Sequence, residues 1–276
     1  MGYHVVDMSA DPRCGQFAYF RRMTFPFAGI TAEVDITDLM AARNGRPFFL
    51  SMLYAVTRAV NAVPQLRRRI TEDGAVVEYD WCAPSYTAMK PDGVYVYCTV
   101  EGDLPYDEFV RLGQSRQREV LERGTLTEDG DVRGMIFVSS VPWLHYTQLQ
   151  HPAESPDDSN PRIGWGKYVT VNGRTTLPVS LFVNHALADG LHIPLTQYMD
   201  AVLGSVAVDN GAVEVLQVVQ NSGHEDRAGR FADTSLLRGD GDFQGFLVHG
   251  HSSFCVGKLV NQLPCLRLQT ANKTEL

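Results

Sequence analysis

The chain has 276 residues, of which 44% are hydrophobic and 20% charged, and its formal net charge is −8. This composition is typical of a globular protein with a sizeable core, and the acidic balance argues against a nucleic-acid-binding protein. No 18-residue apolar run and no signal-peptide pattern are found, so we predict a cytoplasmic protein that does not use a membrane.

The first predicted elements are helices. Asp35–Asp38 offers a helix start, and Asn44-Gly45 is a typical helix end. Apolar residues at helical spacing between Leu50 and Val63 predict a second helix, which Pro64 closes. Nearly all faces of this second helix are apolar or small, so we expect it to be buried.

The middle of the chain combines short strands with one longer helix. Asp73-Gly74 separates two extended runs and predicts a hairpin turn. The β-branched and aromatic run Val94–Val100 favours a strand, and Pro105 opens a helix that continues to about Arg123. The basic run 67–69 precedes the hairpin, and we interpret it as a solvated face rather than a binding patch.

The next region is rich in strand signals. Residues 135–139 predict a strand, and Asn172-Gly173 is a strong hairpin signal whose second strand ends near His185. A helix is expected over 195–202. These elements together predict an α+β fold with a mixed or largely antiparallel sheet flanked by helices.

We predict two parts: a catalytic domain over 1–207 and a C-terminal extension over 208–276. The extension is rich in Gly, Asp and Asn and has only short apolar patches, and its order and role stay open. The five cysteines are odd in number and include no CxxC pair, so we expect reduced thiols and no metal site.

The run "NHALADG" (184–190) places an imidazole where a buried strand stops and a carboxylate four residues later. One interpretation is a satisfied core histidine followed by a turn. The other is a general base, His185, in a loop that Asp189 braces, because a base needs a fixed tautomer and a reactant beside it. HxxxDG alone is too short a pattern to decide between them.

Two further runs favour the catalytic interpretation. In "FVSSVPW" (137–143), Ser139 stands at the end of an apolar strand, where its hydroxyl is able to donate to an oxyanion. "GWGKY" (164–168) brings an indole, a cation and a phenol together, which suits a cofactor with adenine or phosphate. The alternatives are a small strand-end residue and ordinary core aromatics.

Taken together, these segments resemble the type A chloramphenicol acetyltransferase family from about residue 4 to residue 207. The resemblance rests on "NHALADGLH", "FVSSVPW" and "GKY", and also on "RCGQFAYF" (13–20), "EVDITDLM" (33–40) and the run 59–89. It implies the family's fold and direct transfer of acetyl from acetyl-CoA, without an acyl-enzyme, to a hydroxyl of chloramphenicol, which confers antibiotic resistance. It also implies a homotrimer with interfacial active sites.

The resemblance assigns roles to single residues. His185 matches the general base and Ser139 the oxyanion-stabilising serine, while Asp189 matches an aspartate that pairs with Arg13 to hold the catalytic loop. Phe20 falls in the acceptor pocket. Three residues fall where the family contacts coenzyme A: Trp143, Lys167 and Tyr168.

The sequence also departs from the family. Asn184 replaces the first histidine of a common His-His pair, which we interpret as a tolerated variation. Gly164 stands where the family has a threonine that helps to bind the transition state through water. This loss motivates an alternative, an O-acetyltransferase for another small hydroxylated acceptor. A non-catalytic trimeric scaffold is the remaining alternative.

Overall fold

A computed structural model describes residues 2–127 and 130–192. The predicted helix 195–202 and the C-terminal extension lie outside these residues, so the domain boundary near 207 stays a prediction. No helix among the described residues is long and apolar enough to cross a membrane.

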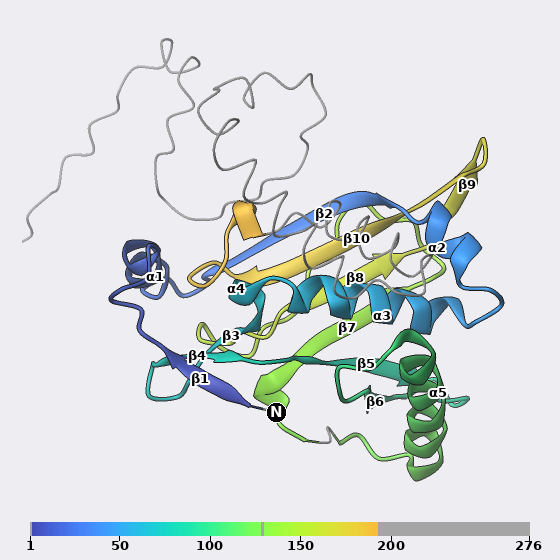
Figure 1. Ribbon diagram of the computed structural model, residues 1–276, viewed down its shortest axis with the longest axis horizontal. Helices are drawn as coiled ribbons and strands as arrows, with labels where there is room; N and C mark the ends of the chain where they lie inside the picture. The colour runs from blue at the N-terminus through green and yellow to red at the C-terminus, as the bar shows by residue number, and fades with distance from the viewer. Residues whose placement is uncertain (1, 128–129, 193–276) are drawn as a thin grey trace, which may run out of the picture. The chain divides into compact units, whose positions relative to one another are not determined.

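The described part has two sheets (Figure 1). The larger sheet has seven strands in the order β2-β10-β8-β7-β5-β6, with β9 paired to β10. The β10 strand is antiparallel to β2, β8 and β9, whereas β7 runs parallel to both β5 and β8. The bounds are β2 Phe27–Asp35, β5 Ala83–Met89, β6 Tyr95–Thr99, β7 Met135–Val141, β8 Arg162–Gly166, β9 Val169–Val171 and β10 Arg174–Asn184.

The smaller sheet has the order β1-β4-β3, and all its pairs are antiparallel. Its strands are β1 Tyr3–Val6, β3 Arg68–Ile70 and β4 Val76–Tyr79, with Gly74 at a φ of +84° in the turn between β3 and β4. The helices are α1 Cys14–Phe20, α2 Thr37–Ala42, α3 Phe48–Asn61, α4 Pro64–Arg67 and α5 Tyr106–Arg123, with the short 3-10 turns η1 Val132–Gly134 and η2 Gly190–His192.

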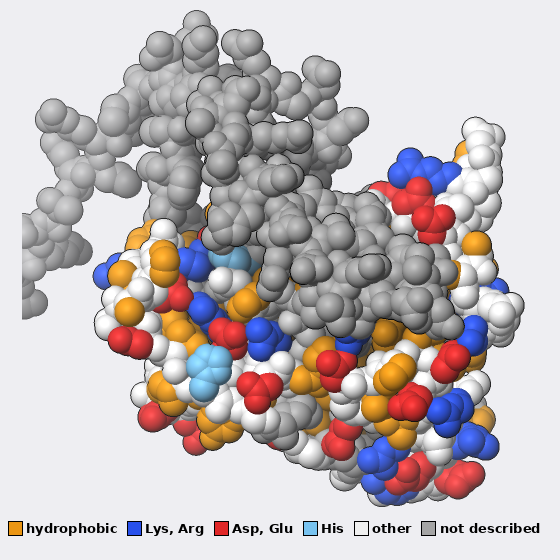
Figure 2. All heavy atoms as spheres, in the orientation of Figure 1, with side chains coloured by type: hydrophobic (Ala, Val, Ile, Leu, Met, Phe, Trp, Pro, Cys, Tyr) orange, Lys and Arg blue, Asp and Glu red, His pale blue; other side chains and the backbone are white. Residues whose placement is uncertain are grey.

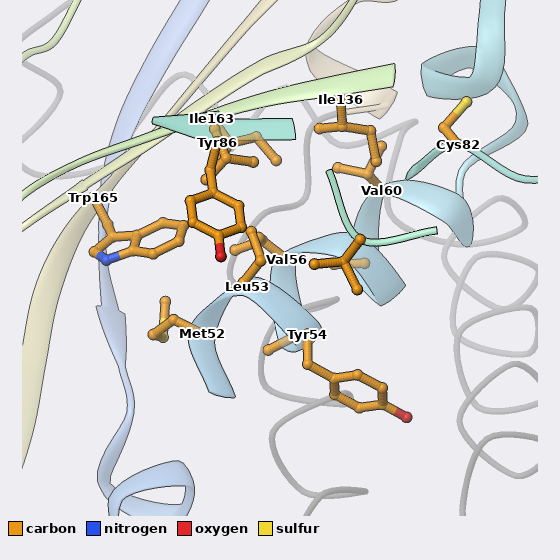
Figure 3. Packing of buried hydrophobic residues seen from close by; sticks show 14 of the residues in the cluster. Met52, Leu53, Tyr54, Val56, Val60, Cys82, Tyr86, Ile136, Ile163 and Trp165 are labelled. Atoms are coloured by element: carbon orange, nitrogen blue, oxygen red, sulfur yellow. The ribbon is translucent and has the colours of Figure 1, made fainter. Parts of the chain in front are cut away.

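The α3 helix lies in the core. Every residue from Leu50 to Val60 except Arg58 is buried, as the nearly continuous apolar pattern predicts. Figure 3 shows Leu53 and Val56 of α3 packed with Ile163 and Tyr86 of the large sheet. Ser139, Gly164 and Ser180 alternate with the core residues of their strands, so they lie on the opposite face of the sheet.

The predicted α+β class is present, as are the predicted helices and hairpins that fall within residues 2–127 and 130–192. Asn44 and Gly45 have positive φ angles of 46° and 78° after α2, and Asn172 and Gly173 have φ angles of 51° and 80° between β9 and β10. Ser139, however, lies inside β7 rather than at its end, because β7 continues to Val141.

The interpretation of the basic run 67–69 as a solvated face is wrong. Arg69 is fully buried, and its guanidinium donates to the carbonyl oxygens of Arg133 at 2.8 Å and Met135 at 3.0 Å. Arg67 and Arg68 both pair with Glu78. The three adjacent arginines are therefore packed into the fold, where backbone carbonyl oxygens and the Glu78 carboxylate accept their hydrogen bonds. On the described part of the face shown in Figure 2, acidic and basic side chains are interspersed.

Candidate active site

His185 follows directly on β10, which lies between β2 and β8 in the large sheet. Its backbone N–H donates to the Pro26 carbonyl oxygen at 2.7 Å, which fixes the first residue of the loop beside the start of β2. The imidazole stacks on the Phe20 ring with a centroid distance of 4.0 Å and an interplanar angle of 15°. The helix α1 thus supplies one wall for the half-buried His185 ring.

A single backbone contact sets the His185 tautomer. Nδ1 lies 3.0 Å from the Ala188 carbonyl oxygen. A carbonyl oxygen only accepts, so Nδ1 carries the proton and Nε2 keeps its lone pair. Burial lowers the pKa of His185 below its ordinary value, and the Arg13 charge acts in the same direction. The ring is therefore neutral at pH 7, with Nε2 as the basic atom.

Arg13 and Asp189 form an ion pair beside this ring. Arg13 uses Nη1 for the Asp189 carboxylate and donates from Nη2 to the His185 carbonyl oxygen at 3.1 Å. Asp189 Oδ1 accepts from the Leu191 N–H at 3.0 Å and lies 2.8 Å from His192 Nδ1. One guanidinium therefore joins both ends of the loop 185–189 to the residues before α1.

The Arg13 segment is in turn tied to the small sheet. The Asp11 carboxylate accepts from the Arg13 N–H at 2.8 Å and from Arg68 Nη1 at 2.8 Å, and Arg68 also pairs with Glu78 on β4 at 3.2 Å. The arginine run that the sequence pattern assigned to solvent is thus part of the support for the candidate site.

Asn184 has a larger structural part than the sequence indicated. It is 2% exposed, and its Nδ2 donates to the carbonyl oxygens of Pro156 at 2.9 Å and Asp158 at 3.0 Å. Its Oδ1 accepts from the Ala186 N–H at 3.0 Å. The amide thus joins the catalytic loop to the segment 156–158, so Asn184 is more than a tolerated variation. The two Nδ2 contacts join residues far apart in sequence, and the sequence showed no sign of them.

Ser139 lies in a row of small residues that crosses four strands. The register aligns it with Gly164 on β8, Ser180 on β10 and Thr31 on β2, all on the face opposite α3. Ser180 Oγ lies 2.6 Å from Thr31 Oγ1 and donates to the Tyr146 hydroxyl at 3.3 Å. The row brings several hydroxyl groups to one face of the sheet.

The three residues matched to coenzyme A contacts lie beyond the ends of β7 and β8. Trp143 is 73% exposed and Tyr168 is 42% exposed, and Lys167 is also exposed. The Lys167 N–H donates to the Leu144 carbonyl oxygen at 2.9 Å, which holds the two turns together. The aromatic rings and the cation thus stand at one uncovered edge.

Within one chain the structure brings together His185, Phe20, Arg13 and Asp189, but it does not bring Ser139 to them. Ser139 aligns with Ser180 through Gly164, and His185 is five residues further along than Ser180. At about 3.3 Å per residue, five residues separate His185 from the Ser139 row by roughly 16 Å along the strand.

The family model "Chloramphenicol acetyltransferase" matches residues 1–199, which is more than half of the chain. The chain belongs to the chloramphenicol acetyltransferase family. It is an acyltransferase by that membership, with the family's α+β fold.

Three chloramphenicol acetyltransferases and one fold neighbour illustrate the similarity. A chloramphenicol acetyltransferase of Escherichia coli is 26% identical over 210 residues, covering 72% of this chain and 94% of the relative. One from Streptomyces acrimycini is 27% identical over 211 residues, covering 73% and 94%. A solved chloramphenicol acetyltransferase covers 75% of this chain and 100% of its own, at 26% identity and a TM-score of 0.61. A catalytic core of a 2-oxoacid dehydrogenase complex from Thermoplasma acidophilum, at 16% identity and a TM-score of 0.51, shares the fold.

The described residues contain no group of three or more His, Cys, Asp or Glu side chains that would hold a metal ion. Cys14, Cys82 and Cys98 form no disulfide among the described residues, and Cys82 and Cys98 are buried.

Proposed function

We propose that this protein transfers an acetyl group from acetyl-CoA to a hydroxyl of chloramphenicol in the cytoplasm, and so inactivates the antibiotic. The observation that carries the proposal is the His185 tautomer: Nδ1 faces a carbonyl oxygen, which leaves Nε2 unprotonated. A neutral imidazole with a fixed basic nitrogen is the group that a direct transfer to an alcohol requires.

In the proposed mechanism His185 acts as base and then as acid. Nε2 takes the proton of the acceptor hydroxyl while that oxygen forms a bond to the thioester carbonyl carbon. Ser139 donates a hydrogen bond to the carbonyl oxygen as negative charge develops there. The bond from carbon to sulfur then breaks, and the proton on Nε2 goes to the sulfur. The products are the acetyl ester and free coenzyme A.

The Arg13–Asp189 pair positions His185 in this proposal, and Phe20 lies at the acceptor pocket because it stacks on the base. Trp143, Lys167 and Tyr168 fit coenzyme A. Their exposure leaves the indole and phenol free to cover an adenine, and Lys167 supplies a charge for phosphate.

We further propose a homotrimer in which each site combines His185 of one chain with Ser139 of the next. The separation of roughly 16 Å within one chain supports this proposal, because both groups must lie within hydrogen-bond reach of the same reacting centre. The exposed fraction of Phe25, which is 46%, adds an apolar surface near the base that a neighbouring chain would cover.

Mixed trimers test this arrangement. Purified His185→Ala and Ser139→Ala proteins, each of low activity, are unfolded, mixed and refolded together. We expect activity to return in the mixture, because some interfaces then combine an intact His185 with an intact Ser139. Each variant refolded alone is the control. A mixture no more active than its components would contradict a site shared between chains.

Thiol release tests the function itself. The full chain is incubated with acetyl-CoA, with or without chloramphenicol, and free coenzyme A is measured with a thiol reagent. We expect release that depends on chloramphenicol, together with an acetylated product detected by mass spectrometry. If the rates are equal with and without the drug, chloramphenicol is not the acceptor.

Replacement of Ser139 by Ala is expected to lower kcat by about a hundredfold, the usual effect of removing one oxyanion donor. KM for acetyl-CoA should change little, since the hydrogen bond strengthens only as charge develops. Ser140→Ala is the matched control, because Ser140 is the next residue on β7 and its side chain faces the opposite side of the sheet. A change confined to KM would argue against the oxyanion role.

The pH profile of kcat/KM should carry an acid limb below pH 6.5. His185 works as a base only when neutral, and its burial lowers its pKa, so activity is present above that pKa and falls as the pH drops through it. Phe20→Ala uncovers the ring and should move this limb upward toward the ordinary histidine pKa. An acid limb that stays in place would mean that the Phe20 ring does not contribute to the shift.

A second acceptor remains a candidate because Gly164 provides no hydroxyl at a position beside Ser139. Screening other small hydroxylated compounds in the same thiol assay separates the two candidates by their kcat/KM values.

A further inference from the structure

His151 lies against the serine row, in the segment that connects β7 to β8. A Cβ atom on Gly164 would be 3.1 Å from His151 Nε2 and 3.5 Å from its Cε1, and would clash with the end of the Leu149 side chain. The imidazole edge and Leu149 therefore fill the space that any side chain at position 164 would need. The absence of a side chain at 164 and the presence of a histidine at 151 are two parts of one packing arrangement.

The inner nitrogen of this histidine lacks a partner. Nε2 is buried and makes no hydrogen bond with any described residue, while the residue as a whole is only half-buried. Leaving a buried polar atom unpaired disfavours the folded state, and such atoms in a native protein call for an explanation. Among the described residues, the Arg162 charge acts on His151, but no group forms a hydrogen bond with Nε2.

The charge state of His151 suits a neutral ligand. Burial, together with the positive charge of Arg162, lowers the pKa of His151 to about 4. Arg162 is itself held by Asp158 and lies 5.2 Å from the centre of the Phe137 ring, so this positive charge is fixed in place. The imidazole is thus uncharged at neutral pH, with one nitrogen that donates and one that accepts.

The position of His151 is close to the proposed chemistry. Gly164 and Ser139 are direct neighbours on adjacent parallel strands, which lie about 4.8 Å apart. The His151 imidazole at Gly164 is therefore close enough to the Ser139 hydroxyl for one small acceptor molecule to contact both. Neither His185 nor the residues matched to coenzyme A has this location.

We propose that His151 is a specificity-determining residue of the acceptor pocket, in which its imidazole hydrogen-bonds a polar group of the acceptor other than the hydroxyl that is acetylated. This inference rests on the proposed function. It implies that the pocket recognises acceptors with at least two hydrogen-bonding groups, as in a diol or a hydroxy-amide. The unpaired Nε2 gains its partner when the ring turns toward the bound acceptor.

Steady-state kinetics of His151→Leu and His151→Gln test this role with chloramphenicol as the probe. We expect His151→Leu to raise the chloramphenicol KM by about tenfold, the effect of one neutral hydrogen bond. KM for acetyl-CoA and the acid limb of the pH profile should stay unchanged. The glutamine amide reaches a similar position with a donor and an acceptor, so His151→Gln should recover part of the affinity.

The control is His4→Leu, the same change at an exposed histidine on β1 of the small sheet. Circular dichroism and thermal melting verify that each variant is folded. A chloramphenicol KM within twofold of the original in His151→Leu would overturn the inference while leaving the proposed function intact. If the unaltered protein acetylates no chloramphenicol, the proposed function fails, and the inference fails with it.

A double-mutant cycle with Gly164 adds a geometric test. Gly164→Ala places a methyl group against Nε2 and should raise the chloramphenicol KM severalfold by displacing the ring. In the His151→Ala background the same substitution should have a smaller effect, because the ring is no longer there to be displaced. If Gly164→Ala raises the chloramphenicol KM by the same factor with and without His151, position 164 does not act through the imidazole, and the inference is overturned.

Discussion

Replacement of His185 by Ala should lower kcat by about a thousandfold, within the usual contribution of a positioned general base. The loss falls on the chemical step because the proton of the acceptor hydroxyl then has no positioned nitrogen to receive it. Acetyl-CoA should still bind, since the residues matched to it lie at the far end of β7 and β8. The expected result is this much lower kcat together with an unchanged dissociation constant for coenzyme A.

Two controls make this result specific. His4→Ala removes an exposed histidine from β1 and should leave kcat unchanged. Free imidazole added to His185→Ala should restore part of the rate, because the Phe20 ring remains to receive it. A His185→Ala protein that is folded and retains more than a tenth of the original kcat would exclude His185 as the base.

Removal of either partner of the Arg13–Asp189 pair should lower both stability and kcat. The side chains are 11% and 27% exposed, so each variant leaves a mostly buried charge without its ion-pair partner. We expect Arg13→Ala and Asp189→Ala each to reduce the free energy of unfolding by about 2 kcal/mol, below the range for fully buried pairs because Asp189 is partly hydrated. The corresponding fall in Tm is about 4–8 °C.

The fall in kcat follows from the second contact of the same guanidinium. Arg13 Nη2 also donates to the His185 carbonyl oxygen, so its loss frees the backbone that carries the base. Arg13→Lys should behave like Arg13→Ala for kcat, since an ammonium does not reproduce the two-point fork.

Arg111→Ala is the matched control, because Arg111 pairs with Glu108 on the exposed face of α5. Stability and kcat that fall no further in Arg13→Ala than in this control would contradict the bracing role.

Local sequence was a sound guide to the elements. The turn residues at 44–45, 73–74 and 172–173 determine where the chain reverses, since few residues other than Gly and Asn adopt positive φ readily. The nearly all-apolar pattern of α3 predicted its burial. His185 was a candidate because it follows a predicted strand directly, and Asp189 because it lies four residues later in a short run.

The sequence pattern did not predict the long-range contacts of Arg69, Asn184 and His151. The sequence pattern assigned Arg69 to solvent, because three adjacent arginines resemble an exposed face, yet carbonyl oxygens from residues 133 and 135 surround its guanidinium. Asn184 looked interchangeable because the two carbonyl oxygens that accept from its Nδ2, those of Pro156 and Asp158, lie far from it in sequence. His151 carried no motif at all.

The sequence by itself determined the elements, the family and the candidate base, because turn chemistry, apolar periodicity and ordered motifs are local properties of the chain. The tertiary structure decided the rest. It fixed the proton on Nδ1 of His185, placed His151 against Gly164, and separated Ser139 from His185 along the strands. The reason is physical: a tautomer, a buried unpaired nitrogen and a distance between strands depend on which distant backbone atoms the fold brings next to a side chain.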